Sequence, residues 1–319
     1  MEEIIQPLVS IGVPVFNGEK GLSRALDCLL EQDYLNLEII ISDNGSTDST
    51  PDICAKYTRK DSRVKYGRSE ENLGSIWNFN RVVELSSGKY FMWAAHDDLR
   101  ARTFVSACVE KMEQCPEAVL CQVHTAVFIE GREERLYVAH LDSFEGVTGL
   151  VERYRETLKH FPATAIYGLY RLSAMRKTQM FQKCIATDLA FIQELSIHGE
   201  FVQVPKVLFN YYGREKWNTT HQDYQTFLGK PRKPWWYLPF VALFYNHWLR
   251  VEGSSIPLFK KLLLWSVIFA HETRQVLLKV LIKVASLLCP ERWKEQLGYA
   301  IYRLWMHNPN LKVDCEILY

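Results

Sequence analysis

Two adjacent carboxylates, Asp97 and Asp98, follow an apolar run of the chain that begins at Tyr90. The run from Tyr90 to Ala95 predicts a buried strand, so the two acids stand where that strand ends. Ligands of open α/β sheets bind at the carboxyl edge of the strands. Acids held this close repel each other, and a divalent cation such as Mg²⁺ or Mn²⁺ relieves the repulsion and also holds a diphosphate. The alternative is a solvated loop in which Asp98 caps the next helix.

A second polar group, from Asp43 to Asp48, follows another predicted strand at 37–42. A third predicted strand, 8–15, ends in a turn that contains Asn17 and Gly18. The helix expected after it has leucines and an alanine at helical spacing between 22 and 30. Strands that each end in a polar turn and then feed a helix predict an α/β fold with a doubly wound parallel sheet. Further elements of this pattern are expected at 64–66, 76–83, 103–115 and 118–127.

Four segments in this order carry a resemblance to a known family: 13–17, 42–48, 72–74, and 88–90 leading to 96–98. The chain resembles glycosyltransferase family 2, the inverting nucleotide-sugar transferases with the GT-A fold. The resemblance extends from residue 7 to about residue 212. It implies a Rossmann-like, mostly parallel sheet flanked by helices, followed by a C-terminal helical appendage.

The resemblance also implies an organisation of the chain. Residues 1–218 would form the GT-A catalytic domain, with a nucleotide-binding half at about 1–127 and an acceptor-binding half at about 128–218. Residues 219–319 would form a helical C-terminal region that contacts an oligomer partner or a membrane interface.

The family's donor site can be carried onto this sequence. Asp43 would accept a hydrogen bond from the imide N–H of the base, and Asn44 stands where the family often has a second acid. Asp98 would ligate the metal, Asp97 would contact the ribose or the metal through water, and His96 would be a spacer in this counterpart of the DXD motif. The remaining residues implied for the nucleotide pocket are Pro14, Val15, Asn17, Arg68, Asn72 and Gly74.

The family's catalytic base stands at the start of a helix in the second half of the chain, and Asp188 is the acid at that position here. A carboxylate within reach of an acceptor hydroxyl acts as a general base. The alternative is an acid that is merely favoured in the first helical turn by the helix dipole. Glu194, further along the same predicted helix, is the fallback base.

The resemblance places Tyr167, Gly168 and Arg171 under the donor sugar and the acceptor. Gly168 would let the backbone approach the sugar closely, and an ordinary strand with one glycine is the alternative. The segment after residue 210 is expected to be an active-site flap, in which Tyr212 and Arg214 contact the sugar or acceptor and Arg214 or Lys216 reaches the diphosphate. His221 is an optional further metal ligand or a structural histidine.

Composition excludes some functions. The 319 residues carry 38 Lys and Arg against 37 Asp and Glu, so the net charge of +1 gives no basis for nucleic-acid binding. Eight cysteines include no Cys-x-x-Cys pair, which disfavours a zinc site and fits a reducing compartment. The N-terminus is acidic and lacks the apolar stretch of a signal peptide. We expect a cytoplasmic protein.

Three apolar runs mark the C-terminal region, at 235–245, 262–270 and 276–288. Each is shorter than the roughly 20 residues that span a bilayer. Three interpretations compete. The runs could pack on the catalytic domain, lie in a membrane interface, or form a contact between copies of the chain. Interface binding would place the protein at the inner face of the membrane and would suit a lipid-linked saccharide acceptor.

The sequence therefore predicts an inverting, metal-dependent glycosyltransferase that uses Mn²⁺ or Mg²⁺. It would move a sugar from a UDP- or dTDP-linked donor to a saccharide hydroxyl in cell-surface polysaccharide or glycolipid assembly. One alternative is a nucleotidyltransferase acting on sugar phosphates. Another is a non-catalytic nucleotide- or sugar-binding protein of the same fold, which would have no need of Asp188.

Overall fold

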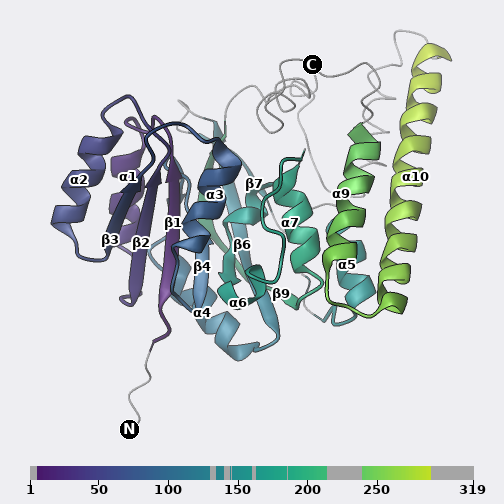
Figure 1. Cartoon of the computed structure of the whole chain (residues 1–319), viewed down its shortest axis with the longest axis horizontal. Coiled ribbons are helices and arrows are strands. Elements are labelled where there is room, and N and C mark those ends of the chain that lie inside the picture. The colour runs from purple at the N-terminus through teal and green to yellow at the C-terminus, as the bar shows by residue number, and fades with distance from the viewer. Residues whose placement is uncertain are drawn as a thin grey trace.

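The computed structural model describes residues 6–129, 134–139, 144, 146–159, 163–184, 186–213 and 239–288. Among these residues nine strands form one mixed sheet, with helices on both of its faces (Figure 1). The strands are β1 (Val9–Val15), β2 (Leu37–Asp43), β3 (Val64–Arg68), β4 (Tyr90–Trp93), β5 (Leu99–Arg100), β6 (Ala118–Ile129), β7 (Arg135–Ala139), β8 (Leu169–Arg171) and β9 (Glu200–Gly213).

The order across the sheet is β3-β2-β1-β4-β8-β6-β9-β5, with β7 paired to β6. Strands β1 to β4 pair in parallel, and β8 runs antiparallel between β4 and β6. Strand β6 therefore points the same way as β4, and β9 is parallel to β6. The carboxyl ends of β1, β2, β4, β6 and β9 all meet at one edge. The chain leaves β1 toward β2 and returns on its other side as β4, and ligands of open α/β sheets bind at such a reversal of strand order.

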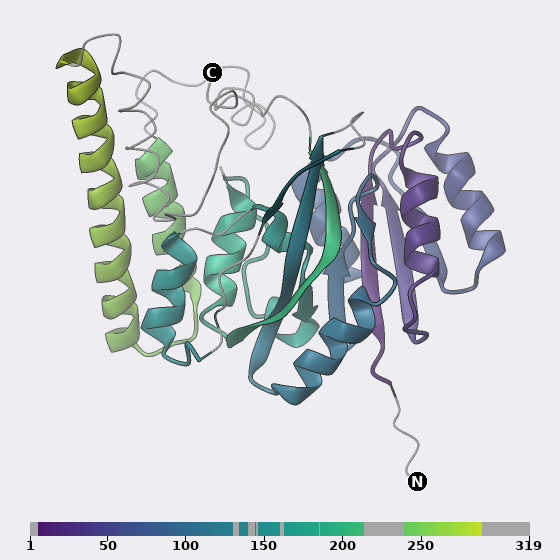
Figure 2. The ribbon, with the colours of Figure 1, turned by 180° about the vertical axis from the view of Figure 1, so that it is seen from behind.

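Two helical layers cover the sheet (Figures 1 and 2). The first core joins residues of α1, α2 and α4 to one face of the sheet, and the second joins residues of α3, α6 and α7 to the other. The helices are α1 (Leu22–Leu30), α2 (Thr50–Lys60), α3 (Ser75–Glu84), α4 (Phe104–Gln114), α5 (Leu150–Lys159), α6 (Leu172–Met175), α7 (Thr187–Leu195), α9 (Pro239–Gly253) and α10 (Leu258–Leu288), with a short 3₁₀ helix, η1 (Ala163–Tyr167).

The first strands are buried on both faces. In β2, Ile39 and Ile41 point into the first core and Ile40 into the second. All seven residues of β1 and of β2 are buried. A strand covered by helices on both sides needs an unbroken apolar run, which explains why the sequence identified these elements clearly.

The C-terminal helices α9 and α10 pack beside α5 at the far side of the molecule from β3 (Figure 1). A third core, which includes Tyr154 of α5, Val251 of α9 and Leu264 and Ile268 of α10, joins them. In the sequence, 262–270 and 276–288 are separate apolar runs. In the structure both belong to the single 31-residue helix α10. Among the helices described, none combines the length and the apolar character that crossing a membrane requires.

Candidate functional site

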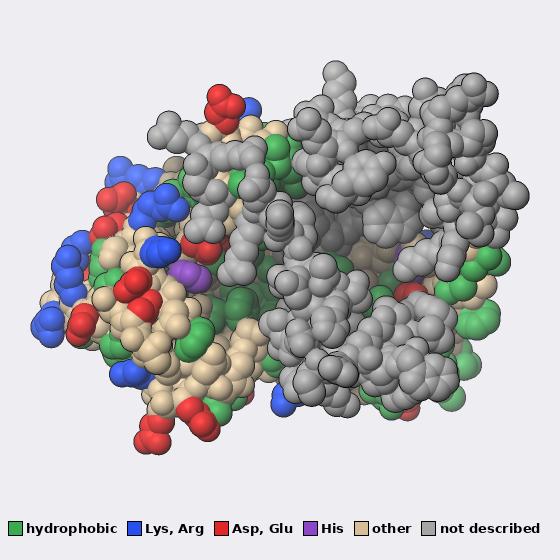
Figure 3. All heavy atoms as spheres, turned by 90° about the horizontal axis from the view of Figure 1, so that it is seen from above, with side chains coloured by type: hydrophobic (Ala, Val, Ile, Leu, Met, Phe, Trp, Pro, Cys, Tyr) green, Lys and Arg blue, Asp and Glu red, His purple; other side chains and the backbone are tan. Residues whose placement is uncertain are grey.

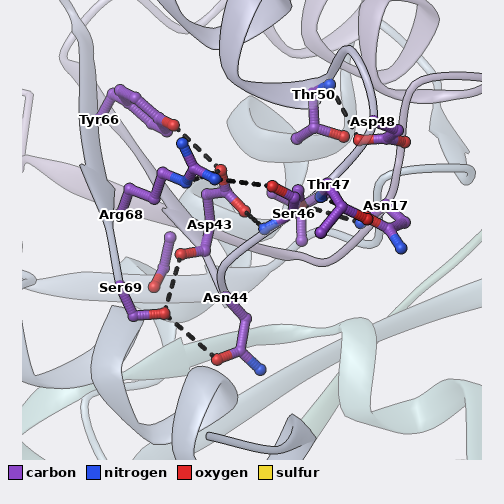
Figure 4. Close-up of polar contacts among 12 residues, drawn as sticks. Asn17, Asp43, Asn44, Ser46, Thr47, Asp48, Thr50, Tyr66, Arg68 and Ser69 are labelled. Carbon is purple, nitrogen blue, oxygen red and sulfur yellow. Dashed lines mark hydrogen bonds and ion pairs between the residues drawn. The ribbon is translucent and has the colours of Figure 1, made fainter. Parts of the chain in front are cut away.

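The loops that follow β1 and β2 are locked together at the carboxyl edge of the sheet (Figure 4). Asn17 has a left-handed backbone, with a φ angle of 52°. Its N–H donates to Ser46 Oγ at 2.9 Å, and its side-chain Oδ1 accepts from the N–H of Thr47 at 2.8 Å. The N–H of Gly18 donates to Thr50 Oγ1 at 2.8 Å. The two loops therefore form one rim, although about 30 residues separate them in a βαβ unit.

Asp43, the last residue of β2, lies fully buried under this rim. Its Oδ1 accepts from the N–H of Ser46 at 2.8 Å, and its Oδ2 accepts from the hydroxyl of Tyr66 at 3.0 Å. Arg68 Nε lies 3.5 Å from the same Oδ2, and its Nη2 donates to the carbonyl of Ser46 at 2.7 Å (Figure 4). The structure thus brings together two of the residues predicted for the nucleotide pocket, Asp43 and Arg68.

Asn44 fastens the loop before α3 to the end of β2. Its Nδ2 donates to Asn72 Oδ1 at 2.8 Å and to the carbonyl of Gly74 at 3.1 Å, and its Oδ1 accepts from the N–H of Leu73 at 2.9 Å. Gly74 has a φ angle of 92°, which side-chain-bearing residues rarely adopt. The amide of Asn44, which is 2% exposed, therefore holds the whole 72–74 loop against the Asp43 rim.

The pairing between strands β1 and β4 ends just below this rim. The last paired residues are Gly12 and Trp93, and Pro14 lies two residues further along β1. Proline has no N–H to donate to a neighbouring strand, so its presence suits the point where the β1–β4 ladder ends. The carbonyl of Val15 instead accepts from the N–H of Asn44 at 2.9 Å. Pro14, Val15 and Asn17 are thus adjacent to the Asp43 rim.

Asp98 follows β4 on the other side of this reversal. Its side chain is 3% exposed, and its Oδ1 accepts from the N–H of Tyr212 in β9 at 2.9 Å. Its Oδ2 is buried and makes no hydrogen bond within the described part of the chain. Burial, with a further contribution from the charge of Asp97, raises the pKa of Asp98 to about 7 against the opposing hydrogen bond from Tyr212. This carboxylate is therefore held in place through one oxygen, and the other oxygen has no partner among the described residues.

The loop that carries these acids lies directly on the first loop. A Cβ added to Gly21 would stand 2.7 Å from the carbonyl oxygen of His96, and one added to Gly18 would stand 2.9 Å from the His96 ring. The guanidinium of Arg24 in α1 donates to the carbonyl of Asp97 at 3.1 Å. Glycine at positions 18 and 21 is therefore needed for this close approach, which sets the position of the acid pair.

The residues present fit a divalent cation that takes one carboxylate ligand from the protein and its other ligands from water and substrate. The described ranges contain no group of three or more His, Cys, Asp or Glu side chains that could hold a metal by themselves. The unpartnered Oδ2 of Asp98 would supply one oxygen ligand. Mg²⁺ characteristically takes one or two carboxylates and completes its shell with water and substrate phosphates, so one carboxylate suits a cation that arrives with a diphosphate. His221, the optional further ligand, lies outside the described residues.

Aromatic residues surround the Asp98 loop. The buried guanidinium of Arg100 donates to the carbonyl of Trp93 at 2.6 Å and lies 5.9 Å from the centre of the Tyr167 ring. Burial, and then the charge of Asp98, raises the pKa of Tyr167. The ring of Tyr212 stacks on Phe128 and carries Arg24 over its face at 4.7 Å. Tyr167 and Tyr212, both predicted for the sugar site, therefore lie beside Asp98.

Figure 3 looks onto this edge of the sheet, where acidic, basic and histidine side chains lie close together beside hydrophobic ones.

Asp188 lies in the first turn of α7, as the sequence predicted. Its charge acts on the hydroxyl of Tyr170, whose pKa is raised first by burial and then by Asp188. Glu194, the fallback base, is 2% exposed and pairs with Arg250 of α9 at 2.5 Å. Burial raises the pKa of Glu194, and Arg250 opposes that rise. Glu194 is therefore committed to an internal ion pair.

The family model for glycosyl transferase family 2 matches residues 10–183, which is more than half of the chain. The chain belongs to glycosyl transferase family 2. The family and the GT-A-like α/β fold predicted from the sequence are thereby confirmed. The match includes the Asp43 rim and the Asp98 loop, and it ends before Asp188.

Curated relatives of this family member align over part of their length. An uncharacterized glycosyltransferase, RP339, of Rickettsia prowazekii (strain Madrid E) is 40% identical over 98 residues, which is 31% of this chain and 30% of that protein. Glycosyltransferase GlyG of Streptococcus pneumoniae serotype 4 is 29% identical over 107 residues, 34% of this chain and 36% of that protein. The chain thus matches about a third of the length of these relatives.

Solved structures extend the likeness in fold. TarS 1-349 of S. aureus in complex with UDP superimposes with a TM-score of 0.60 at 17% identity, covering 91% of this chain and 77% of that one. The mannosyltransferase PcManGT of Pyrobaculum calidifontis, in complex with GDP-Man and Mn²⁺, gives a TM-score of 0.50 at 17% identity and covers 96% of this chain and 89% of that one. At this identity the comparison establishes the fold only.

The structure does not bring every predicted residue of this family member to the carboxyl edge. Arg171 pairs with Tyr90, the first residue of β4, and donates to the carbonyl of Ala118 at 2.9 Å. It therefore lies at the opposite edge, because β8 runs antiparallel to β4. A Cβ added to Gly168 would stand 2.6 Å from the carbonyl oxygen of Cys121, so close packing on β6 explains this glycine. Arg214 and Lys216 lie outside the described residues.

Sequence reasoning missed residues that shape the site. Arg24 occupies a polar position of an amphipathic helix, where a solvent-facing arginine and a site residue look alike. Arg100 follows the acid pair by two residues, and its burial depends on strands that lie far away in sequence. The bracing role of Asn44 depends on a loop that begins 28 residues later. The two glycines at 18 and 21 are a signal that could have indicated a close approach of another loop.

Proposed function

We propose that this chain transfers a sugar from a nucleoside-diphosphate sugar to a saccharide hydroxyl, with inversion at the anomeric carbon and with the help of a divalent cation. The observation that carries the proposal is the buried carboxylate of Asp98, with Oδ1 held by Tyr212 and Oδ2 unpartnered among the described residues. It stands where strand order reverses, beside the locked rim of Asp43. Family membership supplies the class of reaction.

The rim suits the nucleotide half of the donor. Asp43 retains acceptor capacity beyond its bonds to Ser46 and Tyr66 and its ion pair with Arg68, because a carboxylate offers about four lone-pair positions. The base imide N–H would take one of these positions, with Arg68 and the 72–74 loop at its edge. Asp97 would contact the ribose or bind the cation through water. A cation bound at Asp98 would neutralise the charge that develops on the leaving diphosphate.

Asp188 is the proposed general base. The acceptor oxygen bonds to the anomeric carbon as the bond from that carbon to the diphosphate oxygen breaks, and the hydroxyl proton passes to the Asp188 carboxylate. One displacement from the opposite face inverts the anomeric configuration, so this chain needs no nucleophile of its own. Tyr167, Gly168 and Tyr212 remain the candidates for sugar contact, together with Arg214, and Arg171 is left out because of its position at the other edge.

The donor site is tested by a thermal-shift screen of nucleoside diphosphates and nucleotide sugars, with and without Mn²⁺. The solved neighbours were determined with UDP, UDP-GlcNAc or GDP-Man, and for this chain we propose a UDP- or dTDP-linked donor. A ligand that binds the folded state raises the melting temperature by mass action. We expect one base to give a shift that Mn²⁺ or Mg²⁺ strengthens and that Asp98→Ala abolishes. A cation-independent shift retained in Asp98→Ala would contradict the assignment of Asp98.

The base is tested separately with Asp188→Asn. We expect this variant to bind the donor as the wild type does and to lose nearly all transfer to an acceptor. Full turnover by Asp188→Asn would remove Asp188 from the proposed role. Release of pyrophosphate from a nucleoside triphosphate and a sugar phosphate would instead establish the nucleotidyltransferase alternative.

The outer face of α10 supports a lipid-linked acceptor reached from a membrane surface. Phe259, Leu262, Phe269 and Leu277 are each more than half exposed on this helix. Apolar and aromatic side chains on one helical face, with lysines nearby, favour an interfacial location. We propose a peripheral contact of this face with the inner leaflet.

This contact is tested by flotation with anionic vesicles. The wild type should be recovered with the vesicles, whereas the variant Leu262→Glu/Phe269→Glu should remain in the unbound fraction. The control Leu35→Glu alters an even more exposed leucine elsewhere, which is 74% exposed against 55% for Leu262. Failure of the wild type to float would refute the membrane contact, and a dimer detected by sedimentation would favour a contact between copies.

A further inference from the structure

Helix α9 lies beyond the segment that matches the family model, yet it contacts the polypeptide that leads into Asp188. Arg250 of α9 is 3% exposed. Its Nη1 bonds Glu194 Oε2 at 2.5 Å, and its Nη2 donates to the carbonyl of Met180 at 3.0 Å. The neighbouring carbonyl of Leu249 accepts from Gln179 Nε2 at 3.1 Å. One turn of α9 therefore bonds both to α7 and to the segment that precedes α7.

The segment before Asp188 has an unfavourable backbone. Met180 and Ala186 have φ angles of 55° and 53°, in the left-handed region that costs free energy for residues with a side chain. Such conformations persist only where the surroundings impose them, and they cluster at functional sites. Ala186 occupies the position directly before the first turn of α7, which contains Asp188. The direction in which α7 begins, and with it the position of Asp188, is set by this segment.

Three elements hold the part of this segment around Met180. Asn80 of α3 binds Phe181 on both sides, donating to its carbonyl at 2.9 Å and accepting from its N–H at 3.1 Å. Glu194 of α7 accepts from the N–H of Gln179 at 2.9 Å. Arg250 of α9 is the third, because it fixes Glu194 and the carbonyl of Met180 together. Removal of Arg250 would free the carbonyl of Met180 and leave this residue held through its N–H, which donates to Thr178 Oγ1 at 3.1 Å.

A buried ion pair of this kind is poorly explained by stability. Removing two charges from water costs about as much as their attraction returns, so a pair of apolar side chains of similar size serves equally well. An arginine nevertheless offers what an apolar side chain cannot, which is a fork of N–H donors that can bind a carboxylate and a carbonyl at once. The geometry points to a role of Arg250 in positioning the backbone, because the carbonyl of Met180 that it holds lies in the segment that leads to Asp188.

We propose that Arg250 is a positioning residue for catalysis: through Glu194 and Met180 it holds the start of α7, and so the Asp188 carboxylate, in the orientation that accepts the acceptor proton. This proposal rests on the proposed role of Asp188 as the base. It makes α9 a required part of the catalytic apparatus. The donor rim is built from other loops, so donor binding is independent of Arg250.

The test compares two variants that differ in the Met180 contact. Glu194→Gln/Arg250→Met removes both charges and keeps Oε1 as an acceptor for the N–H of Gln179, but it releases Met180. Glu194→Gln alone keeps the bond from Arg250 to Met180. A third variant, Arg176→Met, is the control for loss of a bond from arginine to a main-chain carbonyl, because the exposed Arg176 donates to that of Ser86 at 2.7 Å. Melting temperature and circular dichroism establish that each variant is folded.

We expect kcat of Glu194→Gln/Arg250→Met to fall roughly 10- to 100-fold, as displacements of about 1 Å at a reacting group do. KM for the donor and the affinity for the nucleoside diphosphate should stay within twofold of wild type. Glu194→Gln should lose less, and Arg176→Met should keep full kcat. A folded double variant with wild-type kcat, or one whose loss is in donor KM, would overturn the proposal.

Hydrogen exchange provides a readout that needs no turnover. The N–H groups of Gln179, Phe181 and Gln182 donate within the described structure, so their exchange reports on the segment before α7. Exchange at these amides should quicken in the double variant and stay unchanged in Arg176→Met. Unchanged protection would overturn the proposal whatever the activity. Faster exchange with normal kcat, together with full turnover by Asp188→Asn, would place the error in the role of Asp188.

Discussion

Replacing Asn44 with aspartate separates two roles that this position could have. The family often has an acid here, and on that ground alone an acid would improve donor binding. In this chain Nδ2 of Asn44 donates to Asn72 Oδ1 and to the carbonyl of Gly74, at 2.8 and 3.1 Å. Asn44→Asp loses both bonds, each worth about 1 kcal/mol, and sets a buried negative oxygen against two acceptors. We therefore expect a destabilisation of about 2 to 4 kcal/mol, since unpaired buried acceptors add a desolvation penalty.

A loss of this size is measurable in two independent ways. For a chain of this length it lowers the melting temperature by about 2 °C per kcal/mol, or roughly 4 to 8 °C. The nucleoside diphosphate should bind more weakly, because the 72–74 loop at the edge of the donor site is no longer held. Asn44→Ala serves as the comparison, since it removes the donor, together with the acceptor of the Leu73 N–H, without adding a buried charge. An Asn44→Asp variant that is as stable as wild type and binds the donor more tightly would refute the bracing role.

Three further predictions follow from the packing and the charges. Gly21→Ala should weaken cation-dependent donor binding at least tenfold in a titration, because its Cβ would stand 2.7 Å from the carbonyl of His96 and displace the acid loop. Burial alone would raise the pKa of Glu38, but hydrogen bonds from Lys65 and two serines lower it to about 2, so up to about 3 kcal/mol of stability should be lost as the pH falls from about 4.5 to about 2. Acid unfolding of Glu38→Gln should lack that dependence, and an unchanged profile would contradict it. Trp93→Phe should cost about 2 to 3 kcal/mol in chemical denaturation, because the fully buried indole loses packed volume and its hydrogen bond to α3.

The first half of the fold could be predicted because its strands are buried on both faces. β1 and β2 show this as unbroken apolar runs, and the polar turns after them mark the carboxyl edge. Asp43 and Asp98 were found in the same way, as acids directly after such runs. Once the chain direction of parallel strands is known, all of their carboxyl ends share one edge, so sequence alone brought these acids together.

The antiparallel strand β8 could not be predicted in the same way. Its three residues give too short a pattern to fix a direction, and that direction decides which edge Arg171 occupies. A parallel β8 would have put Arg171 at the carboxyl edge beside the acids. The observed strand places it opposite Tyr90, at the other end. The sequence of the C-terminal helix α10 reads as two apolar runs because polar residues at 271–275 interrupt it, although helix propensity continues through them.

The Asp43 rim and the approach to Asp188 differ in how far along the chain their contacts reach, whereas the Asp98 loop is held to Tyr212 across 114 residues. The donor rim is closed by bonds such as that from Asn17 to Ser46, which spans 29 residues and lies within one βαβ unit. The approach to Asp188 is closed by Asn80 to Phe181, which spans 101 residues, and by Arg250 to Met180, which spans 70. Short motifs can specify the first kind of contact, whereas the second depends on how distant helices dock. Substitutions in α9 should therefore act on kcat more than on donor affinity, and those in the rim should do the reverse.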